Sequence, residues 1–254
     1  HERSAGFTTP GHPEIELALV RLYEATGEKR YLELSKFFID KHGLHENDEK
    51  RYDFANELYN QDDIPLRDRS TAEGHCVRAL YLFCGMADIA ERYADTALAD
   101  ACRRCFDNIV NKRMYITGGV GSTHLGEAFS IDYDLPNRTA YAETCAAISL
   151  VMFARRMQRL EPNAIYGDAV ERALYNGVLS GISMDGSSFF YENPLEIVPK
   201  FNNVNSSTTI KEHFPITQRV EVFDCSCCPP NIMRLIASVG DYLYTYDADT
   251  LYIH

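Results

Sequence analysis

The stretch EGHCVRALYLFCGMADIAERY, from Glu73 to Tyr93, and the segment TALADACRRCFDNIV, from Thr96 to Val110, decide the fold class of this chain. In both segments apolar residues recur with the period of an amphipathic helix. The link between them is short, and two helices joined by such a link lie antiparallel. This stretch therefore predicts a helical hairpin.

Similar helix pairs are expected on both sides of this hairpin. The first is PEIELALVRLYEATG (Pro13 to Gly27) with RYLELSKFFIDKHG (Arg30 to Gly43). The third is TAYAETCAAISLVMFARRMQRL (Thr139 to Leu160) with IYGDAVERALYNGVL (Ile165 to Leu179), and a last helix is expected after Pro230. The pairs begin about every 60 to 70 residues, which is too long a period for a thin solenoid. We expect an all-α fold, an incomplete α/α toroid with fewer hairpins than a closed ring needs.

Long segments separate the expected helix pairs, at residues 44–70, 117–138 and 182–228. Loops of this length in a compact domain usually carry function. We expect all three to gather at one end of the ring. Within the last, GISMDGSSFFYENP predicts a hairpin that turns at Asp185 and Gly186, and the final TLYIH predicts a strand.

Composition excludes several classes of partner. The chain has 254 residues and a net charge of −12, which argues against nucleic acid and anionic membranes. It has no apolar run of about 18 residues, so no membrane span is expected. The eight cysteines do not fit a disulfide framework and indicate a reducing, cytoplasmic location.

Because the chain begins at His1, we expect it to be a fragment of a longer parent with further N-terminal hairpins. We expect this fragment to be inactive alone, or stable only as an oligomer such as a homodimer.

Thiols are concentrated in DCSCCPPN, from Asp224 to Asn231. Adjacent Cys227 and Cys228 cannot easily bond each other, because a vicinal disulfide is strained. Two adjacent thiolates can bind one soft metal, and tetrahedral zinc would need two further ligands. Glu143 and Cys145 in AETCAA could supply them if both face one ion in the first turn of a helix. Cys227 and Cys228 could equally be a buried spacer that binds no metal.

Three segments together resemble glycoside hydrolase family 127. They are LGEAFSIDYDLPNRTAYAETCAA (Leu125 to Ala147), EGHCVRALYL (Glu73 to Leu82) and SCCPPN (Ser226 to Asn231). The characterised members are β-L-arabinofuranosidases with an (α/α)6 barrel followed by β-sandwich domains. The resemblance implies that residues 1–246 form a catalytic barrel domain lacking its first helices. Residues 247–254 would begin the following β domain.

The resemblance also implies roles for individual residues. The zinc ligands would be Glu143, Cys145, Cys227 and Cys228. Cys227 would also be the nucleophile, and Glu127 would be the general acid and then the general base. The sugar pocket would be lined by His12, His75 and Tyr191. Cys225 receives no role, and we expect burial and nearby negative charge to raise the pKa of Glu127.

These assignments predict a retaining exo-glycosidase that releases β-linked L-arabinofuranose from an arabinose-containing oligosaccharide or glycoconjugate. A zinc-bound thiolate would replace the usual carboxylate nucleophile of such enzymes. A sugar epimerase or isomerase on a helical toroid is the alternative enzyme, and it would need no zinc thiolate. A carbohydrate-binding ring with a structural zinc is the non-enzymatic alternative.

Overall fold

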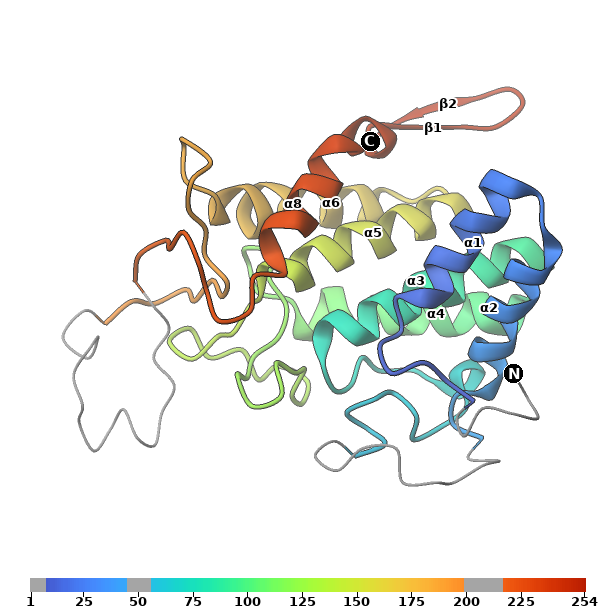
Figure 1. The fold of residues 1–254 in the computed structure, drawn as a ribbon, viewed down its shortest axis with the longest axis horizontal. Coiled ribbons are helices and arrows are strands. Elements are labelled where there is room, and N and C mark those ends of the chain that lie inside the picture. The colour runs from blue at the N-terminus through green and yellow to red at the C-terminus, as the bar shows by residue number, and fades with distance from the viewer. Residues whose placement is uncertain (1–7, 45–55, 199–216) are drawn as a thin grey trace.

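The computed structural model describes residues 8–44, 56–198 and 217–254 (Figure 1). Parts of two predicted loops, 45–55 and 199–216, lie outside the described residues. The described helices are α1 (Ile15–Thr26), α2 (Lys29–Lys41), α3 (Cys76–Tyr93), α4 (Thr96–Asn108), α5 (Thr144–Leu160), α6 (Ala164–Ala173) and α8 (Cys228–Ala237). All three predicted hairpins are present, as α1 with α2, α3 with α4, and α5 with α6.

Helices α3 and α5 form the centre of the molecule, and they pack mainly against each other. Both are buried on nearly all sides, which is typical of a helix enclosed by its neighbours. Phe153 of α5 lies between Phe83 of α3 and Phe106 of α4, with ring centroids 5.5 and 5.6 Å away. This aromatic cluster ties the second hairpin to the third.

Short links turn the chain between the paired helices. Gly27 ends α1 with a φ of 72°, a left-handed conformation that glycine adopts without strain. Asp95 caps α4 by accepting a hydrogen bond from the Leu98 backbone N–H at 3.0 Å. Such a cap pairs one of the free N–H groups at the helix start, which fixes where α4 begins.

Two helices end in wider turns than the sequence predicts. A π-helical turn follows α4 at Ile109–Arg113 and another follows α6 at Leu174–Val178, with a 3-10 turn at Leu179–Gly181 after the second. The first predicted helix ended at Val110, inside the first π turn, and the second was expected to continue regularly to Leu179. A π turn shifts the side chains that follow it, and such turns are frequent at functional sites.

The last helix begins earlier than predicted. Helix α8 starts at Cys228 and contains both prolines in its first turn, whereas the prediction placed its start after Pro230. Proline fits the first turn because the N–H groups there have no partner within the helix. The helix ends at Ala237, and a 3-10 turn follows at Val239–Tyr242.

The β structure is limited to short segments in the described residues. The predicted turn at Asp185 and Gly186 is present, and Ile182 bridges Phe189 across it. At the C-terminus β2 (Leu251–Ile253) contains the predicted strand, but it is the second strand of a hairpin. It pairs antiparallel with β1 (Tyr244–Tyr246), which lies before the predicted domain boundary. The domain division itself stays a prediction.

The described residues fold into a mostly helical, partial α/α toroid with the starts of α3, α5 and α8 at one end (Figure 1). The segments before α3, α5 and α8 meet there (Figure 1). His75 bridges Ala128, and Glu143 bridges Glu192, so backbone pairing joins these segments. Among the described residues, no helix has both the length and the apolar character needed to cross a membrane.

Candidate active site

A cavity of about 560 Å³ opens where the segments before α3, α5 and α8 meet. This volume is in the usual range for sites that bind small molecules. All eight residues that the sequence assigned to a site belong to the cavity region. Seven of them line it: His12, His75, Glu127, Glu143, Cys145, Tyr191 and Cys227. The eighth, Cys228, is fully buried beside Cys145.

Three sulfur atoms form a cluster at the wall of this cavity. The Sγ of Cys145 lies 3.4 Å from that of Cys227 and 3.6 Å from that of Cys228, and the vicinal sulfurs are 3.9 Å apart. All three cysteines are free thiols, as are the other five. Glu143 Oε1 lies 3.6 Å from the Cys227 sulfur. The structure therefore brings together the four residues predicted as metal ligands.

The spacing of these atoms suits a tetrahedral metal ion. Ligand atoms about 2.3 Å from a central zinc would be about 3.8 Å apart, close to the sulfur separations observed. Glu143 is 2% exposed, and its Oε2 has no hydrogen-bond partner among the described residues. A buried carboxylate oxygen without a partner is costly, and a bound cation would remove that cost. The cluster can hold a metal.

The ends of two helices position the cluster. Glu143 precedes the first residue of α5, where its extended backbone turns its side chain toward Cys145 in the first turn. Cys227 and Cys228 occupy the corresponding positions of α8. The positive ends of the two helix dipoles favour thiolates at these positions. Glu143 and Cys145 thus lie close together at the start of a helix, where the sequence analysis expected them.

The contacts within the cluster shift the pKa values of its thiols in opposite directions. Hydrogen bonds with Cys145 and Cys228 lower the pKa of Cys227, while the same contacts raise the pKa of Cys228. Burial raises the pKa of Glu143. Cys227 is the least buried of the three clustered thiols and faces the cavity, so the exposed sulfur is also the one most easily ionised.

Glu127 faces the same cavity from the loop before α5. Its Oε2 lies 3.0 Å from His75 Nε2, and its Oε1 accepts a 2.9 Å hydrogen bond from the Tyr141 hydroxyl. His75 Nδ1 accepts the backbone N–H of Arg78 at the start of α3. In neutral His75 the hydrogen is therefore on Nε2, from which it is donated to Glu127.

The pKa of Glu127 differs from the prediction. The hydrogen bond from His75 lowers it and the one from Tyr141 adds to this, so that together they outweigh the opposing effect of burial. No local pattern in the sequence indicates that these two donors converge on the carboxylate. Glu127 also has a φ of 53°, a left-handed conformation that costs a non-glycine residue roughly 1–3 kcal/mol. Its surroundings must hold it in this conformation.

The predicted sugar-binding residues surround the cluster. The Tyr191 hydroxyl lies 3.6 Å from the Cys227 sulfur, and its ring stacks on Phe223 with centroids 4.9 Å apart. The His12 residue is exposed overall, but its ring lies 6.1 Å from that of Tyr81 at the cavity wall. The resulting desolvation, aided by the charge of Arg78, lowers the pKa of His12 to about 4. A neutral His12 can both donate and accept hydrogen bonds.

Sequence reasoning missed several polar residues at the cavity. Tyr141, which contacts Glu127, lies within the quoted motif between Leu125 and Ala147, so its position was the available signal. Asn231 and Arg234 of α8 both donate to the Tyr81 hydroxyl, at 2.9 and 2.6 Å. Tyr81 lies 150 residues before Asn231 in the chain, and only the fold brings it to these two residues of α8. Cys225 also lines the cavity and is exposed.

The fold belongs to the class of helical α/α toroids. A glycosyl hydrolase family 88 structure from Bacteroides vulgatus covers 94% of this chain with a TM-score of 0.50 and 14% identity, a likeness of fold alone. Residues 2–241 match the family described as "Beta-L-arabinofuranosidase, GH127 catalytic domain". The chain belongs to this glycoside hydrolase family, as its motifs predicted.

Relatives agree with this assignment. The chain is 46% identical over 251 residues to a non-reducing end β-L-arabinofuranosidase of Bifidobacterium longum, a match covering 92% of this chain and 37% of the relative. It is 46% identical, with a TM-score of 0.89, to the crystal structure of a GH127 β-L-arabinofuranosidase from Geobacillus stearothermophilus T6. That match covers 97% of this chain and 40% of the other. The chain thus spans less than half the length of these relatives.

Proposed function

We propose that this chain carries the catalytic site of a retaining exo-glycosidase that releases β-linked L-arabinofuranose. The substrate would be an arabinose-containing oligosaccharide or glycoconjugate. The observation that carries the proposal is that one cavity presents Glu127 and the readily ionised Cys227 together. The activity in the names of the two β-L-arabinofuranosidase relatives supports the choice of sugar.

Zinc is the proposed metal, with Glu143, Cys145, Cys227 and Cys228 as ligands. Thiolates with one carboxylate are a donor set that zinc accepts, and the atom spacing and the unpaired Glu143 oxygen support it. When bound, zinc would keep the Cys227 sulfur deprotonated while an anionic ligand set preserves its electron density. The epimerase alternative gives this cluster no role.

In the first half of the reaction, the Cys227 sulfur attacks the anomeric carbon of the bound sugar. A carbon–sulfur bond forms as the glycosidic carbon–oxygen bond breaks. Glu127 gives its proton to the departing oxygen, so the aglycone leaves as a neutral alcohol. His75 and Tyr141 then stabilise the resulting carboxylate through the hydrogen bonds described above.

In the second half, water replaces the sulfur. The Glu127 carboxylate takes a proton from a water molecule, whose oxygen attacks the anomeric carbon. The carbon–sulfur bond breaks, and the electron pair returns to Cys227 as a thiolate. Two displacements retain the anomeric configuration.

His12, His75 and Tyr191 are the proposed sugar-binding residues. The rings of His12 and His75 lie 6.4 Å apart at the cavity wall. With its pKa lowered, His12 stays neutral near pH 7 and can accept a hydrogen bond from a sugar hydroxyl. Tyr191, beside the Cys227 sulfur, would contact the sugar near its reacting carbon.

Release of p-nitrophenol from p-nitrophenyl β-L-arabinofuranoside by the full-length protein, with and without a zinc chelator, tests the proposal. The expected result is turnover that the chelator abolishes and added zinc restores. Cys227→Ser should lose turnover. If this variant retains both zinc and activity, Cys227 is not the nucleophile, and if wild-type protein releases no arabinose the proposed function is wrong.

A further inference from the structure

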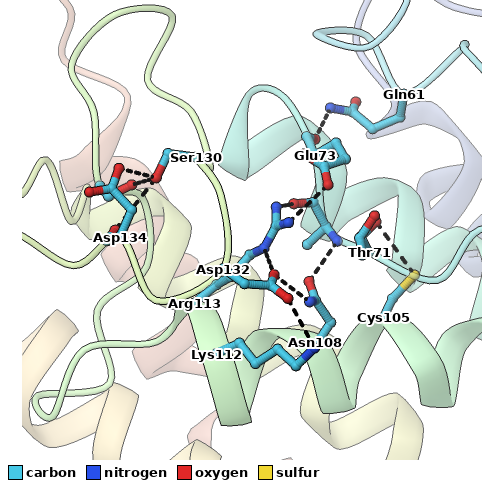
Figure 2. Close-up of polar contacts among 12 residues, drawn as sticks. Gln61, Thr71, Glu73, Cys105, Asn108, Lys112, Arg113, Ser130, Asp132 and Asp134 are labelled. Atoms are coloured by element: carbon cyan, nitrogen blue, oxygen red, sulfur yellow. Dashed lines mark hydrogen bonds and ion pairs between the residues drawn. The ribbon is translucent and has the colours of Figure 1, made fainter.

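A partly buried polar network surrounds Asp132 (Figure 2). Asp132 Oδ1 accepts hydrogen bonds from Arg113 Nε at 2.8 Å and from Asn108 Nδ2 at 2.9 Å. Its Oδ2 accepts a third from Lys112 Nζ at 2.9 Å. Asp132 belongs to the loop that carries Glu127, while the three donors come from the end of α4 and its π turn. One carboxylate thus fixes that loop to a helix end.

The same donors also hold the segment before α3. Arg113 Nη2 lies 3.0 Å from Glu73 Oε1, and its Nη1 donates to the Ala72 carbonyl. Asn108 Oδ1 accepts the Ala72 backbone N–H at 3.0 Å. Arg113 and Asn108 are 7% and 5% exposed, so water competes little for these contacts. Both side chains therefore join residues 72–73 to Asp132.

Residues 72–73 lead directly into the segment that carries His75. Beyond them the chain pairs with the Glu127 loop, where Phe129 N–H donates to the Gly74 carbonyl at 2.9 Å and Cys76 N–H donates to the Glu127 carbonyl at 3.0 Å. The network and this pairing close a ring. The ring holds the backbones of His75 and Glu127 side by side, as their 3.0 Å side-chain contact requires.

The π turn explains how Arg113 reaches both segments. Arg113 is the last residue of the turn Ile109–Arg113, whose wider spacing places its guanidinium between Glu73 and Asp132. The guanidinium has several donors in a fixed plane, so one side chain can serve two carboxylates and a carbonyl. A lysine has the charge but not this geometry.

We propose that Arg113 and Asp132 are positioning residues for the acid/base Glu127, an inference that rests on the proposed glycosidase function. Neither lines the cavity or contacts a proposed metal ligand among the described residues. They act through the backbone that holds Glu127 in its left-handed conformation and against His75. Without the network the left-handed backbone of Glu127 would relax, and its carboxyl group would move away from the departing oxygen.

Leaving-group dependence distinguishes such a role from a general loss of folded protein. Methoxide is a poor leaving group and needs a proton from the acid, whereas p-nitrophenolate leaves without one. The ratio of kcat/KM for methyl over p-nitrophenyl β-L-arabinofuranoside therefore reports acid catalysis, and the fraction of active enzyme cancels in it. We expect Asp132→Asn and Arg113→Lys in the full-length, zinc-loaded protein each to lower this ratio at least about tenfold, as partial loss of general acid catalysis would.

Arg103→Gln is the matched control, because Arg103 of α4 forms its ion pairs with Asp100 and Glu161, neither of which belongs to the network. Its ratio should equal that of the wild type. If Asp132→Asn does not fold, Lys112→Met removes one donor from the exposed side of the network and should lower the ratio less. Folded variants that lose both activities equally, or neither, overturn the inference. A wild type that hydrolyses neither substrate would instead refute the proposed function.

Discussion

Glu143→Gln gives a sharp test of the proposed metal centre, because its effect on stability should depend on zinc. The substitution keeps the size of the side chain and removes one ligand charge. Changes that only disturb a ligand indirectly lower metal affinity about 10- to 100-fold, so loss of the ligand charge should cost about 100-fold or more. When zinc is in excess, a hundredfold weaker affinity lowers the free energy of unfolding by about 2.7 kcal/mol.

Without zinc, Glu143→Gln should no longer lower the free energy of unfolding. In the metal-free protein, the buried Oε2 of Glu143 has no hydrogen-bond partner in the part of the chain that the structure describes, which costs about 1–3 kcal/mol. A neutral amide avoids burying a charge there. The metal-free variant should therefore be at least as stable as the metal-free wild type.

The assay is denaturant unfolding with and without zinc, together with zinc content per chain after dialysis. Glu192→Gln is the matched control, since Glu192 is 3% exposed on the adjacent segment but is not part of the cluster. It should retain zinc. Equal destabilisation of Glu143→Gln with and without zinc, or an unchanged zinc content, would refute the reasoning.

Three further predictions concern other contacts. Tyr141→Phe removes a hydrogen bond to a charged carboxylate, so kcat/KM should fall roughly 10- to 100-fold with little change in melting temperature; an unchanged kcat/KM would contradict this. Gly74→Ala should prevent stable folding, measured by circular dichroism, because φ is +69° and the new Cβ would lie 2.3 Å from the Tyr59 carbonyl oxygen; a native melting curve would refute it. Burial opposes the charged form of His42, but the contacts with Asp62 and a second buried carboxylate outweigh this and raise its pKa. The stability that His42 contributes should be complete below about pH 6.5, its unfolded pKa, and be lost as pH rises through the folded pKa. His42→Gln should flatten this dependence in denaturant titrations, and an unaltered slope would count against it.

The helical architecture could be predicted from the sequence because local patterns determine it. Apolar periodicity located the three hairpins, and the proline and glycine near the ends of α1 gave its limits to within two residues. The predicted start of α8 was wrong, because the prediction treated Pro229 and Pro230 as the end of a loop rather than as part of the first turn of the helix. The π turns depend on tertiary contacts such as those of Arg113, which no local pattern reveals.

The candidate site was predictable in its members but not in its electrostatics. Motif positions alone identified Cys145, Cys227 and Glu127, and the fold brings them to one cavity. The pKa of Glu127 was predicted in the wrong direction, because the hydrogen bonds from His75 and Tyr141 arise from backbone pairing between distant segments. Charge counts along a sequence do not contain this information.

Trapping the glycosyl-enzyme tests the central claim most directly. Glu127→Gln should still transfer arabinose from p-nitrophenyl β-L-arabinofuranoside to the enzyme, since this leaving group needs no acid, but hydrolysis should stall without the base. Peptide mass spectrometry of the quenched, zinc-loaded variant should find one pentosyl group on the Cys227 sulfur. A pentosyl group on Glu143 or any other residue, or a wild-type product with inverted anomeric configuration, would contradict the account.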